Sequence, residues 1–192
     1  SKYSIYFDIS NFEFIYNEIT FSDPTRSCRC IKNNKVTEHL YRGNIFRNSR
    51  NNGNYNSACI DESTSNSNAN VLVEDNIFDY IVGPSQGRCI FINCNQNAEI
   101  NVRNNTIKNL PGGGFYIKIA AIKCTFETCK FINNSVSDRW LGTLGLTPQI
   151  WIETSMTSDI SNEVTLIFNG CYFENNYSPK QGGGISYGKS KH

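Results

Sequence analysis

The sequence predicts an all-β protein in which strands stack as the coils of a solenoid, with about six coils. The first observation is an internal repeat, because five stretches share one order: apolar, any, apolar, any, any, Asn or Cys, any, aromatic or Ile. Their last residues follow one another at steps of 32, 29, 24 and 42 residues. Periods of this size are typical of units that bury a core only by stacking. The stretches are residues 39–46, 71–78, 100–107, 124–131 and 166–173.

Aligning the five stretches gives three mainly apolar columns, which are the second observation. Strand side chains alternate between the two faces of a sheet, so these columns are predicted to face the core. The columns are His39, Val71, Ile100, Cys124 and Leu166; Tyr41, Val73, Val102, Phe126 and Phe168; and Phe46, Phe78, Ile107, Phe131 and Phe173.

Two charged columns alternate with the apolar ones and are predicted to face solvent. The sign of the charge changes from one coil to the next in both columns. Neighbouring strands that pair in register favour this order, because like charges side by side destabilise a sheet. One column is Arg42, Glu74, Arg103 and Glu127, and the other is Arg47, Asp79 and Lys108.

Further segments complete the coils. A Cys-Ile pair recurs at residues 30–31, 59–60 and 89–90 and predicts a third strand, continued less regularly at residues 115–117, 150–152 and 185–187. At the N-terminal side, residues 6–14 are expected to add one more coil, with Phe14 placed 32 residues before Phe46. Apolar residues are mostly two apart, which favours strands over helices. We expect a single domain over residues 1–188 and a tail over 189–192.

A column of Asn44, Asn76, Asn105, Cys129 and Cys171 lies where each coil turns between two strands. Asparagine tolerates left-handed backbone angles, and its amide can form hydrogen bonds along a stack. Such a ladder satisfies buried amides when each coil supplies one. We therefore expect this column to have a structural role.

Residues 173–185 combine a Phe-x-x-Asn element with a Gly-Gly-Gly-Ile element, and residues 131–134 and 112–115 repeat one half each. This pairing resembles the repeat of polymorphic outer membrane protein-like β-helices. More broadly, the five stretches resemble the right-handed parallel β-helix of the pectin-lyase-like superfamily over most of residues 1–188. The resemblance implies a right-handed parallel β-helix, and its narrower form implies an adhesin at a cell surface.

Composition argues against several classes of function. The net charge is +1 and charged residues make up 18% of the chain, so no electrostatic attraction to nucleic acid or anionic membrane is expected. No apolar run reaches the roughly 18 residues of a membrane span. No cofactor or metal site is predicted. The ends carry no amphipathic capping helix, as expected for a piece of a longer protein or for ends that pair with another subunit.

Eight cysteines favour an oxidising compartment. Adjacent strands lie about 4.8 Å apart, within the Cα separation of about 4.4–6.8 Å that a disulfide spans. Stacked pairs such as Cys59 with Cys89 and Cys129 with Cys171 are therefore disulfide candidates. The alternative is that these residues are buried free thiols that pack as small apolar side chains.

Three glycosylation sequons begin at Asn104, Asn133 and Asn176, in turns next to the repeated stretches. They favour a secreted or cell-surface glycoprotein.

An enzyme of the pectin-lyase-like superfamily would need clustered carboxylates and a catalytic Arg or Lys, as the resemblance implies. Most candidates belong to the charged columns, where alternating signs break up an acidic cluster, so ion pairs are the favoured interpretation. Asp61 and Glu62 are interpreted as loop acids without partners. The candidates are Glu74, Asp79, Arg103, Glu127 and Glu174.

The sequence thus favours a non-enzymatic extracellular or cell-surface protein that acts in adhesion or as a structural, self-assembling unit, through its loops and coil ends. A polysaccharide lyase or glycoside hydrolase is the alternative. Expected partners are a protein, a cell-surface glycan or another copy of the chain. The loop at residues 137–148 is expected either to contact a partner or to cover the coils. Its apolar residues are Trp140, Leu141, Leu144 and Leu146.

Overall fold

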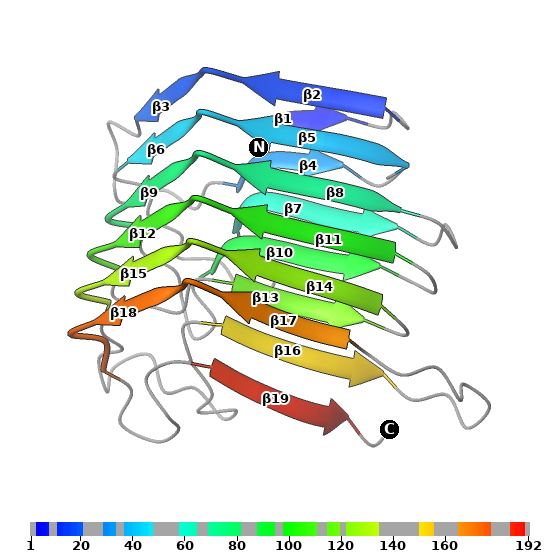
Figure 1. Ribbon diagram of the computed structural model, residues 1–192. Helices are drawn as coiled ribbons and strands as arrows, with labels where there is room; N and C mark the ends of the chain where they lie inside the picture. Colours follow the sequence, from blue (N-terminus) through cyan, green and yellow to red (C-terminus); the bar gives the residue numbers. More distant parts are fainter. Residues whose placement is uncertain are drawn as a thin grey trace.

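Every regular element in the described part of the computed structural model is a β-strand, and the strands form three parallel sheets (Figure 1). The all-β prediction is confirmed. No helix in this part of the chain is long and apolar enough to cross a membrane. The structure describes residues 3–7, 11–20, 29–33, 37–47, 58–64, 69–81, 88–94, 98–110, 115–119, 122–134, 150–155, 165–177 and 185–190.

The chain visits the three sheets in a fixed order. Sheet A has seven described strands, and sheets B and C have six each. After β1 (Tyr3–Phe7), a strand of sheet B is followed by a short strand of sheet C and then by a strand of sheet A, and the chain returns to sheet B beside its earlier strand. We call one such B–C–A passage a unit, and six units run from β2–β4, which begin at Asn11, to β17–β19, which end at Ser190. Figure 1 shows their strands lying in layers, from β2 at the top to β17 and β19 at the bottom.

The strand bounds follow the predicted repeat. Sheet A contains β1 (Tyr3–Phe7), β4 (Arg29–Asn33), β7 (Ala58–Thr64), β10 (Arg88–Cys94), β13 (Phe115–Ile119), β16 (Ile150–Ser155) and β19 (Ile185–Ser190). Sheet B contains β2 (Asn11–Ile15), β5 (Glu38–Arg42), β8 (Asn70–Glu74), β11 (Ala98–Arg103), β14 (Ile122–Glu127) and β17 (Thr165–Asn169). Sheet C contains β3 (Glu18–Thr20), β6 (Ile45–Arg47), β9 (Ile77–Asp79), β12 (Thr106–Lys108), β15 (Lys130–Ile132) and β18 (Tyr172–Glu174).

The strand pairing confirms the predicted columns. In sheet C, Phe46 pairs with Phe78, and the column continues through Ile107, Phe131 and Phe173. The two apolar columns of sheet B pair in the same way. Neighbouring rings stack, with centroids 5.0 Å apart for Phe46 and Phe78 and 4.8 Å apart for Phe131 and Phe173. Stacked aromatic pairs add stability beyond the area they bury.

The first unit differs from the prediction. Phe14 pairs with Tyr41 in sheet B, and Ile19 is the residue that pairs with Phe46 in sheet C. The spacing of 32 residues between Phe14 and Phe46 matches the period of the repeat, which is why the sequence predicts one column for both. The two rings do meet, with centroids 6.4 Å apart, but they belong to different columns.

The left-handed residue at the B–C turn is the one before the ladder residue, which corrects the expected role of asparagine. In units two and three these residues are Gly43 and Asp75, with φ angles of 64° and 59°. Gly43 has a second reason to lack a side chain, because a Cβ there would lie 2.4 Å from the ring of Tyr16. The other left-handed residues at this turn are Tyr16, Asn104, Thr128 and Gly170.

The asparagines form the predicted ladder, which also includes Asn17. The backbone N–H groups of Asn17, Asn44 and Asn76 each donate to the side-chain oxygen of the next ladder asparagine at 2.9 Å. The amide of Asn76 in turn donates to the carbonyl oxygen of Tyr41 at 2.9 Å. The buried amides are therefore satisfied along the stack.

A second asparagine ladder lies at the turn where the chain leaves the short strands of sheet C. The backbone N–H of Leu110 donates to Asn134 Oδ1 at 3.0 Å, and that of Asn134 donates to Asn176 Oδ1 at 3.2 Å. These two asparagines are the last residues of the Phe-x-x-Asn elements. The motif therefore has a structural explanation, since the side chain of its asparagine supports the corresponding turn of the preceding unit.

Candidate functional site

The outer face of sheet B carries the charged column from which enzyme candidates were drawn. Glu74 accepts hydrogen bonds from the guanidinium groups of Arg42 and Arg103, on the strands either side of it. Its side chain is buried beneath them, and the residue is 5% exposed. Burial alone would raise the pKa of the Glu74 carboxyl, but the hydrogen bonds from Arg103 and Arg42 outweigh it and lower that pKa. Both carboxylate oxygens are therefore occupied by ion pairs.

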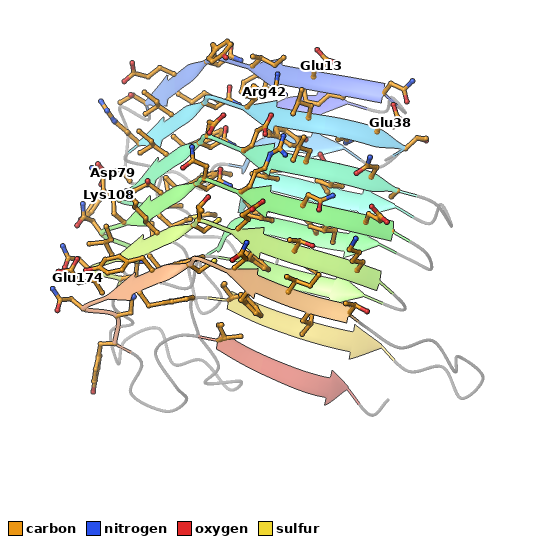
Figure 2. The ribbon with its side chains drawn as sticks, viewed as in Figure 1. Glu13, Glu38, Arg42, Asp79, Lys108 and Glu174 are labelled. Carbon is orange, nitrogen blue, oxygen red and sulfur yellow. The ribbon has the colours of Figure 1, made fainter. Side chains whose placement is uncertain are left out.

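The charged column of sheet C is paired less completely. Lys108 Nζ lies 3.4 Å from Asp79 Oδ2, and Figure 2 shows the two side chains next to each other. Arg47 lies beside Asp79 in register, but its guanidinium reaches Glu18 Oε1 at 3.2 Å instead. The predicted sign alternation is confirmed, and Glu18 of β3 is a further acid that pairs with this column. Glu174 is exposed on β18.

A depression of about 260 Å³ lies on the outer face of sheet B, over β2, β5 and β8. Glu13 and Glu38 contribute to its lining, and Figure 2 labels both on this face. Neither glutamate forms an ion pair or hydrogen bond in the part of the chain that the structure describes. The other outward side chains of the lining are Asn11, Leu40, Asn70 and Leu72.

A buried polar cluster in the core corrects the interpretation of Glu62 as a loop acid. Glu62 lies in β7 with no exposed surface. Its Oε2 lies 3.0 Å from Nδ1 of His39, and its Oε1 accepts a hydrogen bond from the Tyr41 hydroxyl. His39 faces the core, as predicted. The cluster is closed to solvent, so it has no access to a substrate in this structure.

The residues Cys59, Cys89, Cys124, Cys129 and Cys171 are free thiols, so none of the four disulfide candidates among them is bonded in this structure. Cys59, Cys89 and Cys129 are buried, and Cys171 is half-buried. Burial raises the pKa of the Cys89 thiol well above its usual value, with a further contribution from Cys59. Burial also raises the pKa of Cys129, to about 11. The alternative of buried thiols that pack as small side chains therefore describes these residues.

The three sequon asparagines lie in two different environments. Asn104 and Asn133 are exposed, left-handed residues at turns. Asn176 belongs to the second ladder, and its Nδ2 donates to the carbonyl oxygen of Phe131 at 2.8 Å. A glycan is therefore more easily accommodated at the first two. The loop residues Trp140, Leu141, Leu144 and Leu146 lie outside the described residues.

Among the described residues, no group of three or more His, Cys, Asp or Glu side chains is placed to hold a metal ion. Comparison with known proteins adds no identification: no family model, no curated protein and no solved structure matches the chain. The described residues thus define an all-β protein of parallel sheets, with a depression on the charged outer face of sheet B.

Proposed function

We propose that this protein is a non-catalytic extracellular or cell-surface protein that acts in adhesion or as a structural, self-assembling unit. In this proposal the three parallel sheets are the faces of a right-handed parallel β-helix with repeats like those of polymorphic outer membrane proteins. The partners are a protein or a cell-surface glycan, or another copy of the chain at the coil ends. A solenoid suits this role because its stacked units present an extended surface.

The observation that carries the proposal is the pairing of Glu74 with Arg42 and Arg103. A general base needs a free oxygen within reach of the proton that it removes. Both oxygens of this carboxylate are already used, and its lowered pKa makes it a weaker base. A structural role accounts for all three residues.

A contact role for the last described unit is supported by its exposed apolar side chains. Phe168 is 36% exposed, although Phe126, its stacking partner one unit earlier, has no exposed surface. Such an inward-facing ring can be buried by another unit stacked against it. The other exposed apolar side chains of this unit are Ile167, Tyr172, Tyr177 and Ile185.

The test is a glycan array probed with the intact protein, run beside an assay for release of reducing sugar or unsaturated product from pectate and other polyuronates. We expect no turnover, together with retention of a glycan or a protein partner. Turnover that is lost on Glu74→Gln or Arg103→Ala would overturn the proposal.

The alternative function is that of a polysaccharide lyase or glycoside hydrolase. It is favoured by one observation, the two carboxyl groups of Glu13 and Glu38 beside a surface depression. Glycosidases use such carboxyl pairs as acid and base. Turnover that survives Glu74→Gln but disappears in Glu13→Gln or Glu38→Gln would support this function in place of adhesion.

A further inference from the structure

The depression on sheet B carries two negative charges that no described ion pair compensates. Glu18, Glu74 and Asp79 on the outer faces are each paired with Arg or Lys, whereas Glu99 and Glu174 are exposed acids without such a pair in the described residues but lie outside the depression lining. Glu13 and Glu38 are exposed and have no such partner in the described part of the molecule. Exposed glutamates are negatively charged at neutral pH, so the depression attracts a positive group.

The two glutamates belong to adjacent strands. Glu13 lies beside Leu40, and Glu38 lies beside Asn11. The two glutamates therefore stand on neighbouring columns of one sheet face, and both line the depression. A single cation placed between them can interact with both.

The remaining lining suits a cation carried on an apolar stem. Leu40 and Leu72 pair with each other and place two half-buried aliphatic side chains in the lining. Asn11 and Asn70 add amide groups that can accept or donate hydrogen bonds. Lysine and arginine side chains commonly lay their methylene stems on apolar surface while the charged head meets polar groups.

The size of the depression limits the ligand. Its volume of about 260 Å³ lies below the roughly 300–1,000 Å³ of pockets that hold drug-sized ligands. A single side chain is therefore a better match than a large ligand. The six outward lining side chains also include no aromatic ring on which the flat face of a sugar could stack.

We propose that this depression binds the side chain of a lysine or arginine presented by a partner protein. The inference rests on the proposed function, because it names the chemistry by which a non-catalytic surface recognises a protein partner. The stem of the bound residue packs on Leu40 and Leu72, and its charged head lies between Glu13 and Glu38. Asn11 and Asn70 orient the partner's polar groups at the rim.

The test uses N-acetyl-lysine methylamide and its arginine and norleucine counterparts as probes, added to the ¹⁵N-labelled full chain. Norleucine has the same stem length without the charge. We expect the lysine and arginine probes to shift the backbone amide signals of residues 11–13, 38–40 and 70–72, with an affinity that falls as salt screens the charges. Norleucine should leave these signals unchanged.

Glu13→Gln and Glu38→Gln should each weaken lysine binding about threefold, because each removes one ion pair at an exposed site. Glu99→Gln is the matched control, since Glu99 is an exposed acid beside Asn70 on the same face and outside the depression lining. All three positions are exposed, so the midpoint of unfolding should stay unchanged and confirm that the fold is intact.

The inference is overturned if no probe shifts these signals, if norleucine binds as well as lysine, or if Glu99→Gln weakens binding as much as Glu13→Gln. Its failure can be told from failure of the proposed function. Polyuronate turnover would remove the non-catalytic function whatever the lysine result. An absence of both turnover and lysine binding would remove only this inference.

Discussion

Cys129 shows how one residue can partly replace another inside the stack. Its thiol donates to the carbonyl oxygens of Val102 and Glu127, each at 3.4 Å. In the preceding unit, the amide of Asn105 donates to the equivalent carbonyl oxygens of Val73 and Arg103 at 2.8 and 3.0 Å. A thiol is a weaker donor and a weaker acceptor than an amide. The ladder therefore continues through Cys129 with weaker hydrogen bonds.

Cys129→Asn should raise the free energy of unfolding by about 0.5–1.5 kcal/mol, because it restores a full amide at this step of the ladder. Cys129→Ala removes the donor and should lower stability instead. Urea denaturation of the three proteins measures both effects. The account of the ladder fails if the asparagine variant is destabilised as much as the alanine variant.

At the scale of the strand, the ion pairs of Glu74 bind β5, β8 and β11 together. Arg42 and Arg103 lie on the two strands that flank the glutamate. Their side chains are 37% and 50% exposed, so solvent screens part of the attraction. The contribution to stability is modest at each pair but is shared across three units.

This pairing predicts a pH dependence. The pKa of Glu74 is lower in the folded protein than its ordinary value of 4.5, so its contribution to stability is fully present above that value. The contribution is lost as pH falls through the folded pKa, where the carboxylate is protonated. We expect Glu74→Gln to cost about 1–2 kcal/mol at neutral pH and much less in acid. Denaturation of both proteins across this range measures the difference, and equal losses at every pH would contradict the pairing.

The His39–Tyr41–Glu62 cluster joins β5 of sheet B to β7 of sheet A through the core. Glu62→Leu leaves the imidazole and the hydroxyl without this acceptor, and it should lower the free energy of unfolding by roughly 3–5 kcal/mol. Thermal or chemical unfolding is the measurement. Glu99→Leu, at an exposed position of β11, is the comparison variant and should cost less. A neutral effect of Glu62→Leu would show that the cluster is not in the core.

At the scale of the whole molecule, the regular period of the core columns made the units predictable from sequence. The columns with Phe46 and Tyr41 repeat because every unit must fill the same interior position. The position of Glu62 was missed because the Cys-Ile signal marks only the beginning of β7, and the acid three residues after Cys59 was assigned to a loop. The polarity of Glu62 alone favoured an exposed loop position. A buried polar partner such as His39 makes a core position possible for this carboxyl group.

The second ladder and the depression were missed for other reasons. Only two units have asparagine three residues after the aromatic position, as at Asn134 and Asn176, so no full column was visible in the sequence. The depression depends on Glu13 of the first unit. Because the sequence alignment put Phe14 in the column of Phe46, it did not place Glu13 beside Leu40. Its shape also depends on side chains from three strands, which a single repeat does not reveal.

The central claim is that the units stack in parallel with the aromatic column in one register. A crystal structure of the chain tests this most directly. The account predicts that Phe46, Phe78, Ile107, Phe131 and Phe173 follow one another in a single inward-facing stack, with Glu74 between Arg42 and Arg103 on the opposite, outer side of the neighbouring sheet. Antiparallel pairing of these strands, or a register in which any of these five residues faces solvent, would contradict it.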